Sequence, residues 1–203
     1  MTRILLLNAS PRGDQSHGYG LAMRAIDASA WKGAHVTYRD LVQSPIPPIS
    51  AAYAHAITTG APHDAPALDT SERLISELEA HDVLFIVTPM HNFTVPAALK
   101  LWLDHVIRIN RSFTSTPTGK VGSLKDRPSY VLVSSGGFHV GERARQADFL
   151  TPYLTYALAS IGIKNVRFFA LQGLVLGEEA VRHAVGEAAF ALGAAIGSET
   201  EQG

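Results

Sequence analysis

The distribution of apolar residues along the chain predicts alternating strands and helices. Five short runs rich in apolar or β-branched residues are predicted strands, at residues 3–8, 35–39, 82–88, 129–134 and 166–171. Residues 4–7 and 83–87 are apolar at every position, which is typical of parallel strands buried on both faces. Helical spacing of apolar residues predicts helices at residues 19–30, 69–80, 95–109, 148–161 and 178–196.

This order of elements predicts the fold class. Strands that alternate with helices indicate an α/β domain with a parallel sheet and helices on both faces. Right-handed crossovers leave few topologies, and five strands favour a three-layer, flavodoxin-like fold with strand order 2-1-3-4-5. We therefore expect a single domain over residues 1–203. Its ligand should bind beyond the carboxyl ends of the strands, near strands 1 and 3.

Two connections are predicted to be irregular. Residues 41–68 hold five of the eleven prolines and are expected to form a long insertion without regular structure. This insertion is either a plain surface loop, a wall of the ligand pocket or an arm that reaches a partner subunit. Residues 110–128 are predicted to form a second polar loop, in which Phe113 is another candidate for the pocket wall.

Composition excludes several classes of protein. Of the 203 residues, 46% are hydrophobic and 17% charged, which indicates a globular chain, and a net charge of −1 offers no basic field for nucleic acid or membranes. The absence of cysteine excludes disulfides and thiol nucleophiles, and the nine histidines follow no metal-binding spacing. Without a membrane-span or signal-peptide pattern, we expect a cytoplasmic protein with no metal.

The loop after the first strand has the features of a phosphate-binding site. It opens directly into a helix, whose first backbone amides lack partners and lie at the positive end of the helix dipole. Hydroxyl groups, a guanidinium and glycine can add contacts, so the predicted phosphate-binding residues are Ser10, Arg12, Ser16, His17 and Gly18. The alternative is that Ser16 only caps the helix. The loop matches neither the Walker motif nor the dinucleotide fingerprint.

Two further loops favour a flat ring with a polar edge. The loop after strand 3 combines apolar side chains with an amide, in Pro89, Met90, His91, Asn92 and Phe93. The loop after strand 4 has paired glycines whose backbone can approach a ligand, in Ser134, Ser135, Gly136 and Gly137. Core packing and a simple turn are the respective alternatives. Together the three loops predict a mononucleotide, and FMN is favoured because no acidic residue is placed for a ribose hydroxyl.

These loops, together with residues 151–154 and 161–163, resemble the FMN-dependent NADH:quinone oxidoreductase and azoreductase family of flavodoxin-like homodimers. The resemblance covers nearly the whole chain. It implies that the first loop holds the FMN phosphate, that residues 90–93 lie along the isoalloxazine and that residues 134–137 meet its pyrimidine edge. The chain has Gly18, His91 and Ser135 where the family often has serine, tyrosine and arginine.

The resemblance also implies a reaction. NADH or NADPH would deliver hydride to FMN, and a quinone or aromatic azo compound would then take two electrons at the same face, by a ping-pong mechanism. His91 is a candidate contact with the substrate, and His139 is a candidate stabiliser of reduced flavin; the alternative for His139 is an exposed loop residue. A flavin-binding redox sensor without turnover and a phosphate-ester enzyme without flavin are the rival functions.

Overall fold

The computed structural model describes residues 1–200, and a five-stranded parallel sheet forms its centre. The strand order is β2-β1-β3-β6-β7. These strands are β1 (Arg3–Asn8), β2 (His35–Asp40), β3 (Val83–Pro89), β6 (Ser129–Ser134) and β7 (Val166–Leu171). Since β6 and β7 are the fourth and fifth strands of this sheet along the chain, the predicted order 2-1-3-4-5 is confirmed.

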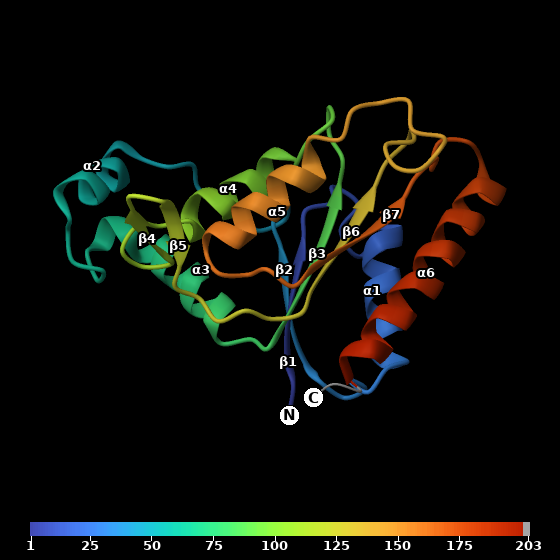
Figure 1. Cartoon of the computed structure of the whole chain (residues 1–203), viewed down its shortest axis with the longest axis horizontal. Helices are drawn as coiled ribbons and strands as arrows, with labels where there is room; N and C mark the ends of the chain where they lie inside the picture. Colours follow the sequence, from blue (N-terminus) through green and yellow to red (C-terminus); the bar gives the residue numbers. More distant parts are fainter. Residues whose placement is uncertain (201–203) are drawn as a thin grey trace.

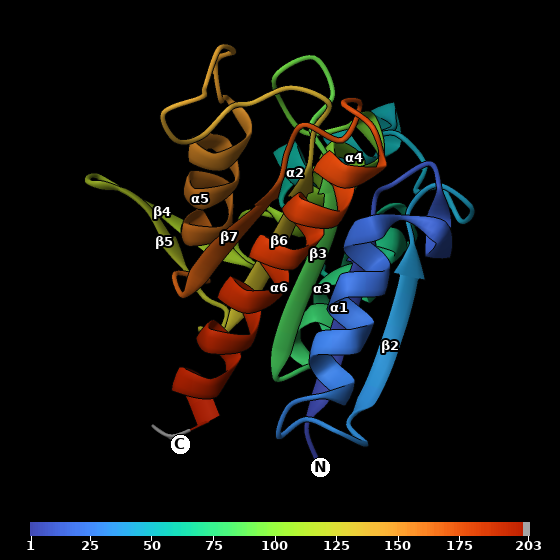
Figure 2. The same ribbon diagram turned by 90° about the vertical axis from the view of Figure 1, so that its right-hand side faces the viewer.

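Helices cover both faces of the sheet, as predicted. In Figure 1, α1 (His17–Asp27) and α6 (Glu178–Thr200) lie on one side of the strands, and Figure 2 views the same two helices from that side. The opposite face is covered by α3 (Asp69–Glu79), α4 (Ala97–Val106) and α5 (Leu150–Ser160). All five predicted helices are present, with ends that differ by a few residues. No helix in the described chain is both long and apolar enough to cross a membrane.

The buried side chains form one core on each face of the sheet. Ile4 and Leu6 of β1 join the core beneath α1 and α6, whereas Leu5 and Leu7 join the core beneath α3, α4 and α5. All four side chains are completely buried. This two-sided burial explains the uninterrupted apolar runs in the sequence. It leaves the ends of the strands as the places where the sheet can bind a ligand.

The two connections predicted to be irregular contain regular structure, so these predictions are wrong. The Pro-rich segment holds the helix α2 (Ala51–Thr59) and the short η2 (Pro66–Leu68). Its prolines lie outside α2, and the Ser50 hydroxyl caps that helix by accepting from the Tyr53 amide. The second connection forms a hairpin of β4 (Phe113–Thr116) and β5 (Gly119–Gly122). Figure 1 shows α2 and the hairpin at the same end of the molecule.

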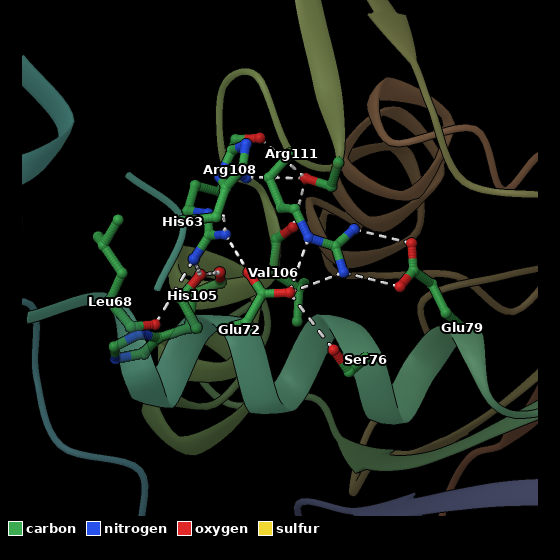
Figure 3. A network of polar contacts seen from close by, with 11 residues as sticks. His63, Leu68, Glu72, Ser76, Glu79, His105, Val106, Arg108 and Arg111 are labelled. Carbon is green, nitrogen blue, oxygen red and sulfur yellow. Dashed lines mark hydrogen bonds and ion pairs between the residues drawn. The ribbon is translucent and has the colours of Figure 1, made fainter. Parts of the chain in front are cut away.

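A buried polar network fastens the Pro-rich segment to the body of the domain (Figure 3). Arg108, which is almost completely buried, forms an ion pair with Glu72 of α3 and lies 3.3 Å from His63 Nδ1. Glu72 also accepts a hydrogen bond from Arg111, which pairs with Glu79. Burial alone would raise the pKa of Glu72, but the bonds from Arg111 and Arg108 outweigh it and lower the pKa. Glu72 is therefore charged at neutral pH.

Replacing Glu72 by glutamine is expected to lower the free energy of unfolding by about 2 kcal/mol at neutral pH, because buried Arg108 loses its anionic partner. Since folding depresses the pKa of Glu72, its contribution is present above the ordinary value of 4.5 and is lost as the pH falls through the folded-state pKa. The difference between variant and wild type should shrink on acidification. Urea unfolding at neutral and acidic pH measures it. Glu79→Gln, at a more exposed carboxylate, is the control and should cost less than about 1 kcal/mol.

Candidate functional site

A pocket of about 290 Å³ lies where β1, β3 and β6 end, at the edge that the sequence predicts. It is open to solvent and draws its residues from all three predicted loops and from the segment after β7. Its lining consists of Ser10, Pro11, Arg12, Ser16, His17, Pro89, Met90, His91, Ser134, Ser135, Gly136, Leu174 and Val175. Six predicted residues do not line it, namely Gly18, Asn92, Phe93, Phe113, Gly137 and His139.

The first loop is organised by Asn8, a residue to which sequence analysis assigned no role. The Asn8 side chain is completely buried, and its Oδ1 accepts from the Ser10 amide at 3.0 Å. Its Nδ2 donates to the Gly13 carbonyl at 2.8 Å and to the Tyr38 hydroxyl at 3.1 Å. One side chain thus fixes both halves of the turn that precedes α1. A polar residue at the end of a fully apolar strand is the sequence signal that identifies it.

Beyond this turn, the loop presents hydrogen-bond donors. The Ser16 hydroxyl accepts from the Tyr19 amide at 3.2 Å, so Ser16 does cap α1. The cap leaves the amides of His17 and Gly18 without an acceptor anywhere in residues 1–200. Arg12 makes no ion pair with any described residue. Capping and anion binding are therefore compatible, and two free amides, a hydroxyl and a guanidinium suit a phosphate.

Gly18 has a packing role in addition to its free amide. A Cβ at this position would lie 2.7 Å from Cγ1 of Val87 on β3, which is too close for a carbon–carbon contact. Glycine therefore lets the start of α1 approach the sheet. This contact gives a physical reason for glycine at position 18.

The second loop contains a tight turn with two residues at positive φ. His91 and Thr94 exchange backbone hydrogen bonds of 2.9 and 3.1 Å, and the two residues between them, Asn92 and Phe93, have φ values of 46° and 73°. A positive φ strains phenylalanine. The turn is held in place by a hydrogen bond of 3.0 Å from the Phe149 amide to the Phe93 carbonyl. Asn92 and Phe93 therefore sit at the exposed tip of the loop, whereas Met90 and His91 reach the pocket.

The third loop offers three consecutive backbone donors. The amides of Gly136, Gly137 and Phe138 have no acceptor within the described chain. The Gly137 carbonyl accepts from the Ser135 hydroxyl at 2.8 Å and from the Gly173 amide at 3.3 Å. Successive free amides can bind partial negative charge without a charged side chain. The loop therefore suits the electron-rich edge of a ring.

His139 is buried against this loop, so the alternative of an exposed loop histidine is wrong. Its Nδ1 lies 3.0 Å from Ser135 Oγ, and its backbone amide donates to Gln172 Oε1 at 3.1 Å. Burial lowers the pKa of His139, against an opposing influence from Asp148. The side chain thus lies behind Ser135 instead of lining the pocket.

Sequence analysis missed the residues that complete the apolar side of the pocket. Leu174 and Val175 follow β7 and join the lining. Gln146 lies next to the second loop, where its Nε2 donates to Met90 Sδ at 3.3 Å. Within residues 1–200, no three acidic or histidine side chains converge in a way that could hold a metal ion. The donors and apolar surface together fit a ligand with a phosphate at one end and a flat ring at the other.

Comparisons with known proteins find a matching family model and similar sequences. A family model described as a flavodoxin-like fold matches residues 2–195. The chain is 57% identical over 194 residues to FMN-dependent NADH:quinone oxidoreductase 4 of Pseudomonas fluorescens, which covers 95% of this chain and 94% of the relative. It is 51% identical to FMN-dependent NADH:quinone oxidoreductase 5 of Burkholderia lata, over 89% of this chain and 90% of the relative.

Solved structures share the fold at lower identity. An azoreductase from Bacillus anthracis superimposes with a TM-score of 0.79 at 21% identity, over 95% of this chain and 99% of that protein. An FMN-dependent NADH-azoreductase from the same species, solved in complex with FMN, has a TM-score of 0.77 at 22% identity, over 95% and 98% of the two chains. At these identities the likeness extends to the fold alone.

Proposed function

The chain belongs to the flavodoxin-like family of FMN-dependent NADH:quinone oxidoreductases, and from this premise we propose that it binds FMN at the carboxyl edge of its sheet and transfers two electrons from NADH to quinones. The observation that carries this proposal is the presence of two sets of free backbone amides in two of the loops that line one pocket. One set is at His17 and Gly18, and the other runs from Gly136 to Phe138. When bound, FMN supplies the redox chemistry, and the protein supplies binding and orientation.

Each loop has a distinct task in this proposal. The amides of His17 and Gly18, the hydroxyls of Ser10 and Ser16 and the charge of Arg12 bind the phosphate. Met90, His91, Leu174 and Val175 line the part of the pocket that would hold the ring, and Asn92 and Phe93 lie at the exposed tip of the neighbouring loop. The amides from Gly136 to Phe138 would hold the electron-rich edge of the ring and favour a form that carries more negative charge.

The donor and the acceptor use the same open face of the pocket. NADH is the donor, and a quinone or an aromatic azo compound then occupies the position that the nicotinamide has left. His91 contacts the acceptor, because its side chain lines the pocket at the exposed turn. One shared position requires the oxidised donor to leave first, which is a ping-pong mechanism. A cytoplasmic location is supported by the absence of cysteine and the use of NADH.

The proposal is tested with purified protein. We expect a yellow protein with a flavin absorption spectrum, which oxidises NADH continuously when menadione is supplied. Initial-rate plots at several menadione concentrations should give parallel lines, whereas intersecting lines count against a shared position. A yellow protein without turnover would favour a redox sensor. A protein that does not bind FMN would favour a phosphate-ester enzyme.

We also propose that the protein is a homodimer whose second copy closes this pocket. Its volume of about 290 Å³ is just below the range of ligand pockets, about 300–1,000 Å³, which suits a pocket that a second copy completes. Three large aromatic side chains are exposed in the second loop and along α5: Phe93 by 48%, Phe149 by 61% and Tyr156 by 73%. Phe149 and Tyr156 are seven residues apart at α5 and therefore share one helix face. Such a patch is typical of a protein–protein interface.

Replacing Tyr156 by glutamate is expected to halve the molar mass measured by light scattering, because two copies of the charge would face each other across a two-fold interface. FMN affinity should fall with the loss of the second copy. Phe190→Glu is the matched control, since Phe190 is 84% exposed on α6, over the opposite face of the sheet. A dimer that survives Tyr156→Glu but not Phe190→Glu would place the interface on α6 instead.

A further inference from the structure

The Ser135 hydroxyl connects the free amides of the third loop to His139. Its oxygen lies 2.8 Å from the Gly137 carbonyl and 3.0 Å from His139 Nδ1. A hydroxyl has one proton to donate, and a carbonyl oxygen can only accept. Ser135 therefore donates to Gly137, and His139 Nδ1 must donate to Ser135. Neutral His139 is thus the tautomer with its proton on Nδ1.

This chain of bonds holds the orientation of a backbone segment with two consecutive glycines. Gly136 and Gly137 have no side chains to restrict rotation of the peptide groups around them. The Gly137 carbonyl is held by the Ser135 hydroxyl and, more loosely, by the Gly173 amide at 3.3 Å. In this orientation the three amides from Gly136 to Phe138 stay free to bind a ligand. Rotation of the peptide after Gly137 would replace the last of these donors by a carbonyl oxygen.

The loop is supported from its other side as well. Gln172 Oε1 accepts from the amides of His139 and Val140 at 3.1 and 3.3 Å, and Gln172 Nε2 donates to the Val140 carbonyl. The backbone of His139 is therefore fixed independently of its ring. The ring nitrogen Nδ1 lies 3.0 Å from Ser135 Oγ and donates to it, in keeping with the Ser135 proton being directed at the Gly137 carbonyl.

We propose that Ser135 is a positioning residue for electron transfer: it keeps the Gly137 carbonyl turned away from the ring and aims the loop amides at the pyrimidine edge of FMN. This inference rests on the proposed function, which places FMN in this pocket. Preorganised donors stabilise the form of a ligand that carries more negative charge. Ser135 should therefore favour reduced over oxidised FMN, although it does not itself take part in the reaction.

The test compares wild type with Ser135→Ala and Ser135→Thr as full-length, FMN-loaded proteins. The dissociation constants of oxidised and of anaerobically reduced FMN are measured for each. We expect Ser135→Ala to weaken binding of reduced FMN by about tenfold, the equivalent of one hydrogen bond of about 1.4 kcal/mol, with oxidised FMN changed by less than about threefold. Ser135→Thr keeps the hydroxyl and should retain the wild-type ratio. Equal weakening of both forms would show a merely structural role and overturn the proposal.

Nitrogen NMR of labelled histidine supplies a readout that needs no FMN. His139, assigned with a His139→Gln variant, should carry its proton on Nδ1 in wild type and shift toward the Nε2 tautomer in Ser135→Ala. A wild-type ring protonated on Nε2 would overturn the assigned direction of the hydrogen bonds. Failure of wild type to bind FMN would overturn the proposed function, whereas normal FMN binding with an unchanged Ser135→Ala variant would overturn this inference alone.

Discussion

Replacing Gly162 by alanine is expected to destabilise the fold by about 4 kcal/mol, which is a large part of the stability of an ordinary domain. Gly162 follows α5 with a φ of +109°, which strains any residue that has a side chain. A Cβ at this position would also lie 2.3 Å from the Leu124 carbonyl oxygen, a backbone atom that cannot rotate away. Both costs, about 1–3 kcal/mol each, apply at once.

Gly177→Ala separates the two costs. Gly177 has a similar φ of +102°, but a Cβ there would have no atom within 4 Å. In this control we expect the free energy of unfolding to fall only by the cost of the strained backbone, about 1–2 kcal/mol. Urea unfolding followed by circular dichroism gives both values, and equal losses for the two variants would show that the contact with Leu124 is unimportant. Gly122 of β5 also packs closely against this turn, because a Cβ at position 122 would lie 2.0 Å from the Gly162 nitrogen.

The sheet could be predicted from the sequence because burial on both faces leaves a clear pattern. Every residue of β3 up to Thr88 is buried, so its run of apolar residues stands out. The hairpin of β4 and β5 has no such pattern, since three of the four residues of β5 are exposed. The helix α2 is short and has prolines on both sides, so the composition of the segment does not predict a helix. Short elements held by tertiary contacts carry little signal of their own.

The three loops of the site could be predicted because the topology brings strand ends together. The contributions of Leu174 and Val175 could not, because they depend on how the chain continues after β7. The sequence leaves two roles possible for His139, a contact with the flavin or an exposed loop residue. The structure shows that His139 is buried by its contacts with Ser135 and Gln172, which the spacing of residues in the sequence does not reveal. Asn8 was missed because the sequence shows a polar residue at the strand end, but not that its side chain is completely buried and bonded to the first loop.

Replacing Asn8 by alanine is expected to reduce the preference of the apoprotein for FMN over riboflavin by about 100-fold. Asn8 holds the first loop through the Ser10 amide and the Gly13 carbonyl, so its loss removes two to three hydrogen bonds, or about 2–3 kcal/mol. Riboflavin has the same ring as FMN but lacks the phosphate. If the loop binds the phosphate, FMN affinity should fall whereas riboflavin affinity should change little. Fluorescence titration of the apoprotein with each flavin measures both.

Tyr38→Phe is the matched control for this prediction. The Tyr38 hydroxyl is the third partner of Asn8 and also donates to Asp40, and burial is the main reason that its pKa is raised to about 12. Phenylalanine removes this partner but leaves both bonds from Asn8 to the loop, so the preference for FMN should remain within about threefold of wild type. Asn8→Ala would contradict the proposal if it weakened both flavins equally, because the effect would then arise from general loosening of β1. An unchanged preference in Asn8→Ala would mean that the phosphate binds elsewhere.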